Sequence, residues 1–311
     1  VILTTPPGFR PLHLEYAVQQ GKHIFCEKPV AVDGPGIRRV LAACAEAKKK
    51  NLSVVSGLCY RYDLPKVELM KRVHDGAIGK IVTLQTNYNA GTPWHRGHRK
   101  NWSNVETQLR NWLFYNWLSG DHVTEQSVHG IDKIAWAMKD EPPLHCKASG
   151  GRTIRTADHF GNVYDHFNSV FEWKDGTKAF HSCRQWDGKG IYREVSDFAF
   201  GTDGTAAIQN HRISGKNAWK PERRRKRINM YQQEHNELFR SIREGKPINN
   251  GHYMCNSTLM ALMVRTSAYT GRTITYKQML ESKQSLVPDQ LDMNGDFEHK
   301  PVAVPGKYEF A

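Results

Sequence analysis

Two short apolar runs on either side of one helix-length segment constrain the fold of this 311-residue chain more than any other feature. Residues 1–5 (VILTT) and 23–26 (HIFC) are apolar enough for strands that are covered on both faces. Between them, a Pro-Pro-Gly breaker precedes residues 11–20, which have helix length and are followed by Gly21. A strand, a helix and a second strand in this order predict a βαβ unit with parallel strands.

The same pattern continues for one further unit. Asp33 has the side chain of an N-cap, and it begins a predicted helix that reaches about residue 50. Residues 52–58 form another short apolar run, so three neighbouring parallel strands are expected, half of a doubly wound sheet. Lys28 directly follows the second strand, at the end where open α/β sheets bind their ligands. This position favours a functional role for Lys28.

The chain from residue 62 onward predicts a second, α+β domain. Its strand-like runs follow one another with short turns between them, such as the turn at residues 174–176. Short connections indicate an open, largely antiparallel sheet, whose free face is available for substrate residues or for a second subunit. We therefore expect a domain boundary between residues 61 and 62. The strand-like runs are residues 80–90, 163–173, 177–184, 193–200 and 205–209.

The chain is strongly basic, with a formal net charge of +13. Part of the excess is local, because residues 220–227 (KPERRRKR) contain six basic residues and one Glu. A run of this kind is usually a solvated loop, so we expect a small-molecule ligand rather than nucleic acid. No apolar run approaches the length of about 18 residues that a membrane span needs, so no membrane partner is expected.

The cysteines carry no sign of a metal or disulfide framework. None of the six is part of a CxxC pair, and four of them lie in apolar surroundings. We expect free, buried thiols at Cys26, Cys44, Cys59, Cys146, Cys183 and Cys255.

Five segments follow one another in a characteristic order: VILTTPPGFRPLH (1–13), GKHIFCEKP (21–29), LCYRYDLP (58–65), SGDHVTEQSVHGIDKIAWAM (119–138) and YQQEHNELFRSIREGKPI (231–248). Together they resemble the Gfo/Idh/MocA family of NAD(P)-dependent oxidoreductases. The resemblance implies the second half of a Rossmann-type dinucleotide-binding domain at residues 1–61, and a substrate-binding and oligomerisation domain at residues 62–311. It also implies NAD or NADP as the cofactor, a sugar or polyol as the substrate, and a homo-oligomer formed through the open sheet.

The resemblance assigns cofactor contacts to the residues that follow the first two strands. Thr5, Pro6, Pro7 and Lys28 would contact the nicotinamide end of the cofactor, and Glu27 would lie near its ribose. The family's Gly-rich phosphate loop precedes these strands, and the chain begins at an apolar strand without a methionine. We expect a piece of a longer protein, inactive as it stands and without readable localisation signals.

The catalytic residues implied by the resemblance are Lys28, His129 and Glu125. A helix is expected from about residue 123, which would place Glu125 and His129 four residues apart on one face, with Asp132 one turn further. The family has Asp-x-x-x-His here, so Glu125 stands where Asp is usual. In this interpretation Lys28 and His129 move the proton of a carbinol, and Glu125 orients the imidazole.

Four further residues are candidates for substrate binding: Arg61, Trp94, Asp132 and His166. Trp94 belongs to a predicted long loop at residues 91–117 that contains four tryptophans, which form either a substrate lid or the packing of the loop itself. His122, together with Glu125 and His129, also has the spacing of three metal ligands. Histidine is common in this chain, so we favour the assignment without a metal.

Three functions remain open from the sequence. The first is a nicotinamide-dependent oxidoreductase acting on a sugar or polyol. The second is a glycosidase that uses NAD for transient oxidation, which would need the same Lys28 and His129. The third is a sugar or nucleotide sensor on the same fold without catalytic activity.

Overall fold

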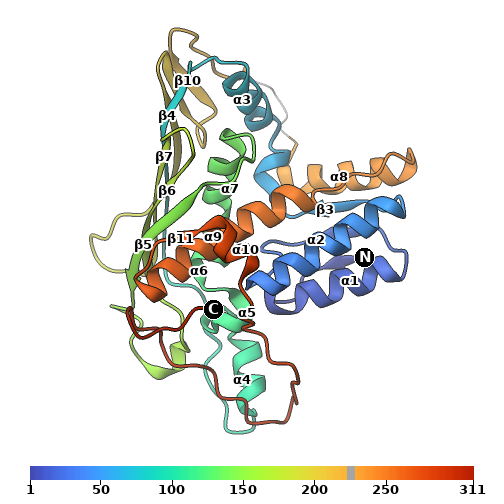
Figure 1. Cartoon of the computed structure of the whole chain (residues 1–311), viewed down its shortest axis with the longest axis vertical. Helices are drawn as coiled ribbons and strands as arrows, with labels where there is room; N and C mark the ends of the chain where they lie inside the picture. Colours follow the sequence, from blue (N-terminus) through green and yellow to red (C-terminus); the bar gives the residue numbers. More distant parts are fainter. Residues whose placement is uncertain (223–227) are drawn as a thin grey trace.

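The computed structural model describes residues 1–222 and 228–311, so residues 223–227 of the basic run lie outside the described residues. Its strands form two sheets, one small and one large, with helices packed between them and around the small sheet (Figure 1). This arrangement confirms the expected class, a Rossmann-like parallel sheet followed by an α+β unit with a largely antiparallel sheet. The domain boundary at residues 61 and 62 stays a prediction.

The small sheet contains three parallel strands in the order β1-β2-β3, joined by two helical crossovers as predicted. Asp33 caps the second of these helices, because its carboxylate accepts a hydrogen bond from the N–H of Gly36 at 2.8 Å. The elements are β1 (Ile2–Leu3), α1 (Arg10–Gln19), β2 (Ile24–Cys26), α2 (Gly34–Lys49) and β3 (Val54–Ser56).

Both faces of the small sheet are covered. Ile24 and Val54 pack in the main core together with residues of α1 and α2. Phe25 and Val55 point to the other face and pack against Leu238 of the helix α8 (Met230–Arg243). Burial on both faces explains why these strands are continuously apolar.

The large sheet contains eight strands in the order β10-β9-β8-β4-β7-β6-β5-β11. Within residues 1–222 and 228–311, the pair of β4 and β7 is parallel and the other pairs of this sheet are antiparallel. Five of the strands were expected from the sequence to within a few residues. The strands are β4 (Ile81–Ala90), β5 (His145–Gly151), β6 (His166–Glu172), β7 (Lys178–Gln185), β8 (Glu194–Gly201), β9 (Gly204–Ala207), β10 (Arg212–Gly215) and β11 (Ile274–Thr275).

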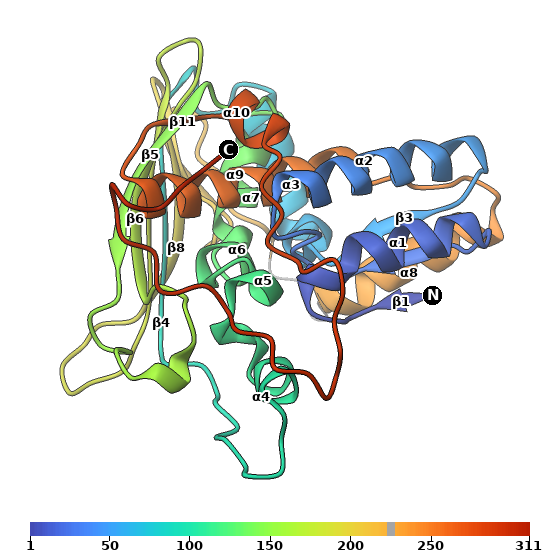
Figure 2. The same cartoon turned by 60° about the horizontal axis from the view of Figure 1, so that its bottom comes forward.

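Helices cover one face of the large sheet, and its other face is open (Figures 1 and 2). The longest of them, α9 (Gly251–Thr270), is buried over nearly its whole length because it packs between the two sheets. No helix in residues 1–222 and 228–311 is long and apolar enough to cross a membrane. Further helices are η1 (Pro7–Phe9), η2 (Cys59–Tyr62), α3 (Leu64–His74), α6 (His122–Glu125), α7 (Val128–Ala137), η4 (Asp158–Phe160) and α10 (Tyr276–Glu281).

The predicted long loop at residues 91–117 is wrong in its second half. That part folds into α4 (Asn104–Arg110), η3 (Trp112–Phe114) and the start of α5 (Asn116–Ser119). Trp117 is only 2% exposed and packs edge-on against Phe9 and Phe297. Its side chain therefore belongs to a local core and not to a lid.

All six cysteines are buried and free, as expected. Burial raises the pKa of the Cys26 and Cys44 thiols to about 12. Thiols with such a pKa are protonated at neutral pH and are inert as nucleophiles.

Candidate active site

Residues at the carboxyl ends of the three parallel strands form one side of the candidate site. Thr5, Pro6 and Pro7 follow β1, and the Glu27-Lys28 pair follows β2. Arg10 ties the two segments together, because its buried guanidinium donates hydrogen bonds to the backbone carbonyls of Thr5 and Pro29. The candidate cofactor contacts from two different strands are thus held as a unit.

Lys28 points from this edge toward the second domain. The Lys28-Pro29 peptide bond is cis. The Lys28 ammonium donates to two acceptors of the same residue, the backbone carbonyl of Glu125 at 2.5 Å and its carboxylate at 3.0 Å. Both side chains are 16% exposed, so the ion pair is largely shielded from water.

The expected contact between Glu125 and His129 is replaced by the contact with Lys28. The predicted continuous helix is wrong, because α6 ends at Glu125 and α7 starts only at Val128. Ser127 lies in this break, and its hydroxyl is hydrogen-bonded to His181 of β7 at 2.7 Å. The interruption removes the four-residue spacing on one helix face. Within the described chain, Nδ1 of His129 is buried without a hydrogen-bond partner.

His129 nevertheless lies beside the site. Its ring is perpendicular to the ring of Tyr60, with the ring centroids 5.4 Å apart. Burial lowers the pKa of His129 well below its usual range, and the positive charges of Lys28 and Lys133 lower it further. The imidazole is therefore neutral at neutral pH, and one of its nitrogens remains available to a ligand or to water.

Arg61 and Asp132, two candidates for substrate binding, are occupied with each other. The Arg61 guanidinium contacts the Asp132 carboxylate at 2.8 Å and the Asp140 carboxylate at 2.6 Å, and it lies over the ring of Tyr253. Asp132 also accepts from the hydroxyl of Ser257 at 2.7 Å and is 1% exposed. Both groups are thus paired with other side chains in a buried cluster, and their role in substrate binding stays a prediction.

His166, another candidate for substrate binding, lies at the start of β6. In the ladder of the large sheet it pairs with Arg184, while its neighbour Phe167 is buried on the helix-covered side. Successive side chains of a strand alternate between faces, so His166 lies on the open face of the sheet. It is not directed toward Lys28. Trp94 lies in the segment before α4, where it is 46% exposed.

His122 belongs to a buried hydrogen-bond network. Its Nδ1 lies 3.1 Å from a carboxylate oxygen of Asp121, and its Nε2 lies 3.4 Å from Sγ of Cys183. Within the residues that the structure describes, no three His, Cys, Asp or Glu side chains are grouped as metal ligands.

Glu234 is a candidate functional residue that was not identified from the sequence. It lies on α8, is 2% exposed, and its Oε2 has no hydrogen-bond partner among the described residues. Burial raises the pKa of Glu234 to about 8, with a further contribution from the charge of Glu27. Segment 231–248 resembles the family only as a whole, and no local pattern in it distinguishes a buried carboxyl from the surface carboxylates of the same helix.

Gly57 and Glu27 approach each other closely at the ends of β2 and β3. Gly57, directly after β3, faces Glu27 so closely that a Cβ atom would lie 2.5 Å from its carboxylate oxygen. Glycine thus leaves room for the Glu27 carboxylate, whose other contact is the N–H of Lys28 at 3.2 Å. These residues fit the nicotinamide end of a dinucleotide.

Comparison with known proteins agrees with this geometry. Residues 1–56 match a sequence profile described as "Oxidoreductase family, NAD-binding Rossmann fold", and residues 67–207 match the profile of the GFO/IDH/MocA C-terminal domain. The chain belongs to the Gfo/Idh/MocA family. The small sheet therefore falls within the match to the family's Rossmann profile, and strands β4 to β9 of the large sheet fall within the match to its C-terminal profile.

Relatives within the Gfo/Idh/MocA family have several named activities. Inositol 2-dehydrogenase of Rhizobium meliloti is 23% identical over 68% of this chain and 57% of the relative. The 2,7-anhydro-N-acetylneuraminate hydratase of Escherichia coli is 24% identical over 69% of this chain and 52% of the relative. The chain thus spans little more than half the length of these curated relatives.

The fold is also that of solved structures from this family. Aldose-aldose oxidoreductase from Caulobacter crescentus, solved with glycerol, superposes with a TM-score of 0.70. It is 20% identical and covers 88% of this chain and 78% of its own. At this level of identity the likeness establishes the fold.

Proposed function

We propose that the full protein is a nicotinamide-dependent oxidoreductase that acts on a carbinol of a sugar or polyol. The observation that carries this proposal is the shielded ion pair between Lys28 and Glu125, at the carboxyl ends of the parallel strands and beside a neutral His129. The family's NAD-binding profile over residues 1–56 and the inositol and aldose enzymes among its relatives support it.

Lys28 is the proposed proton-transfer group. Its ammonium donates the proton to the oxygen atom of a carbonyl substrate during reduction, and it takes the proton back during oxidation. Glu125 holds the ammonium in place through two contacts, so it acts as a positioning residue. His129 supplies a neutral imidazole nitrogen that accepts or donates a hydrogen bond at the same substrate hydroxyl.

Thr5, Pro6, Pro7 and Glu27 would hold the nicotinamide end of NAD or NADP. The cofactor, when bound, supplies hydride transfer at the nicotinamide ring. Glu27 would bind a ribose hydroxyl with the carboxylate that Gly57 accommodates. Arg10 keeps the two binding segments at a fixed separation, because it hydrogen-bonds the backbone of both.

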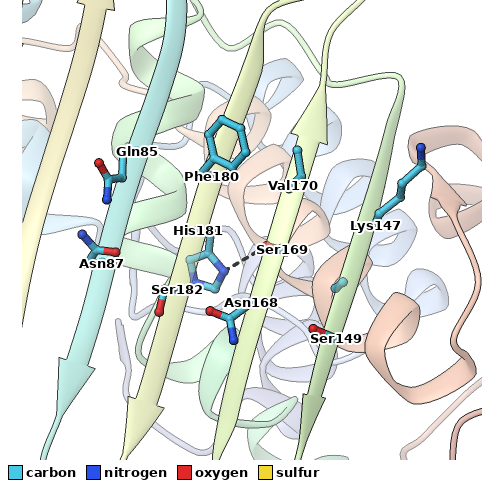
Figure 3. Close-up of a pocket in the computed structure, with 11 residues that line it drawn as sticks. Gln85, Asn87, Lys147, Ser149, Asn168, Ser169, Val170, Phe180, His181 and Ser182 are labelled. Carbon is cyan, nitrogen blue, oxygen red and sulfur yellow. Dashed lines mark hydrogen bonds between the residues drawn. The ribbon is translucent and has the colours of Figure 1, made fainter.

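The open face of the large sheet is proposed to bind a second copy of the chain. A hollow of about 460 Å³ lies there, and Phe180 is 48% exposed within it. A polar row and a mixed row of side chains run across the same strands, a pattern suited to a subunit interface that is partly apolar. Figure 3 shows the polar row Ser149, Asn168, Ser182 and Asn87 beside Lys147, Val170, Phe180 and Gln85.

A second candidate function is a glycosidase that oxidises its substrate transiently. The hydratase among the relatives supports this second candidate, since its name describes a reaction without net oxidation. Incubation of the full protein with NAD and aryl glycosides separates the two functions. Aglycone release without accumulation of NADH would establish the glycosidase, and NADH formation that matches substrate consumption would establish the dehydrogenase.

A further inference from the structure

A second hollow, away from Lys28, is lined by three arginines and two tryptophans. It has a volume of about 380 Å³, within the range of small-molecule sites. It lies in the segment before α4 and on α4 itself, at the end of the molecule opposite α3 and β10 (Figure 1). The lining residues are Trp94, His95, Arg96, Arg99, Trp102 and Arg110.

The guanidinium groups are held against indole rings. Arg96 lies 4.8 Å from the ring centre of Trp94, and Arg99 and Arg110 lie 5.2 Å and 4.7 Å from that of Trp102. Contact with an indole ring restricts the positions that a guanidinium can take. The arginine side chains are therefore partly ordered before a ligand binds.

The backbone of this segment is anchored to a buried residue. The amide of Asn111 is fully buried, accepts from the N–H of Arg96 at 2.8 Å and donates to the carbonyl of Gly97 at 2.9 Å. His95 uses both ring nitrogens, toward the carbonyl of His159 at 3.0 Å and the N–H of Gly97 at 2.9 Å. Arg96 thus projects from a fixed turn.

Positive charge exceeds negative charge around this hollow. Residues 94–110 contain four Lys or Arg and one carboxylate, Glu106, which pairs with Arg110 at 2.7 Å. Among the described residues, the guanidinium groups of Arg96 and Arg99 have no hydrogen-bond acceptor. Two forked donors that face one hollow fit the oxygens of a carboxylate or sulfate.

We propose that this hollow binds the anionic group of an acidic saccharide. The choice of a saccharide as the carrier of the charge rests on the proposed function, whereas the choice of an oxyanion rests on Arg96 and Arg99. A hollow of this volume holds one or two oxyanions. A nucleic-acid surface instead contacts a series of phosphates along a backbone, so the hollow favours the saccharide.

Calorimetric titration of the full protein tests the proposal. The probes are a tetrasaccharide of galacturonic acid, a neutral tetrasaccharide, inorganic sulfate and a 12-nucleotide single-stranded DNA. The variants are the double change Arg96→Gln and Arg99→Gln, and a control, Arg212→Gln, on the exposed surface of β10. We expect the acidic tetrasaccharide to bind at least about 10-fold more tightly than the neutral one. The double substitution should weaken binding of the acidic tetrasaccharide by about 10- to 100-fold, and the control substitution should weaken it by less than about 2-fold.

Several results would overturn the proposal. Equal binding of the acidic and neutral tetrasaccharides, or an unchanged affinity of the double variant, would refute the anion site. If sulfate binds as tightly as the acidic tetrasaccharide, the ligand is not a saccharide. If DNA binds more tightly than the acidic tetrasaccharide, and the double variant loses this binding, the ligand is a nucleic acid. Cofactor turnover is measured separately. Binding without turnover would refute only the proposed function, and turnover without charge-dependent binding would refute only this site.

Discussion

The ammonium of Lys28 lies 3.0 Å from the carboxylate of Glu125, although 97 residues separate them in the chain. Lys28 follows a strand of the small sheet, and Glu125 ends a short helix that packs with the large sheet's helices. The ion pair therefore joins the two parts of the fold at the candidate site, and its two members are the residues whose replacement is most informative.

Replacing Lys28 by Ala should lower the turnover of the full protein by about 10² to 10⁴-fold, because a proton-transfer group is lost. Affinity for the nicotinamide cofactor should change little, since the backbone contacts of Arg10 to Thr5 and Pro29 remain. Steady-state kinetics and cofactor titration measure the two effects. Lys22→Ala, an exposed lysine just before the same strand, is the matched control and should keep parental turnover.

Glu125→Gln should cost less, about 5- to 50-fold in turnover, because the amide keeps a hydrogen-bond acceptor for Lys28 and loses only the charge. Glu125→Asp should behave similarly. Its carboxylate is one methylene shorter and is drawn back from the ammonium, while the backbone carbonyl of residue 125 still accepts from Lys28. Rate profiles against pH for both variants check this. A larger loss for Glu125→Gln than for Lys28→Ala would contradict the positioning role.

The small sheet was predictable because each of its βαβ units is local in sequence. The apolar runs, the Gly and Pro breakers and the Asp33 cap lie within a few dozen residues of one another, and the resulting strand order was correct. Five strands of the large sheet were also visible as runs, whereas β5, β10 and β11 were not. The strand order was not predictable, since β4 in the centre pairs with β7 and β8 across about 100 residues.

The candidate site was predictable only in part, because its contacts are set by tertiary packing. Spacing alone places Glu125 and His129 on one helix, and it contains no sign that Ser127 bonds to His181 on a distant strand and lies in a break of that helix. In the same way, Arg61 and Asp132 look like free polar groups until the fold brings them together.

Acidification should destabilise the fold through His181, which bonds to Ser127 and Ser169. Burial lowers the pKa of His181 to about 3, with a smaller effect of His122. The unfolded chain has a pKa of about 6.5 at this position and binds the proton first, so stability falls as pH drops below that value. From pH 7 to pH 5, His181 alone should cost about 2 kcal/mol in the free energy of unfolding.

Urea unfolding of the parent and of His181→Gln at the two pH values measures this contribution. The variant should be less stable at pH 7 and lose less stability on acidification. If both proteins lose the same free energy of unfolding between pH 7 and pH 5, His181 does not control the acid sensitivity of the fold.

Phe180→Asp should weaken self-association if the open sheet face binds a second copy, because it introduces a charge into an apolar contact. Phe239→Asp is the matched control, since Phe239 lies on α8 and is equally exposed at 48%. Sedimentation velocity of the full protein should show a smaller species only for Phe180→Asp. A parent protein that is monomeric at micromolar concentration would exclude the interface.

The most direct measurement of the proposed function is nicotinamide reduction by the full protein, with NAD and with NADP, against inositols, aldoses and acidic sugars. We predict substrate-dependent formation of NADH or NADPH with at least one polyol or sugar, and its loss by at least about 100-fold in Lys28→Ala. Turnover that Lys28→Ala retains at the parental rate, or sugar binding with no cofactor reduction by the parent, would contradict the assignment of Lys28 as the proton-transfer group of an oxidoreductase.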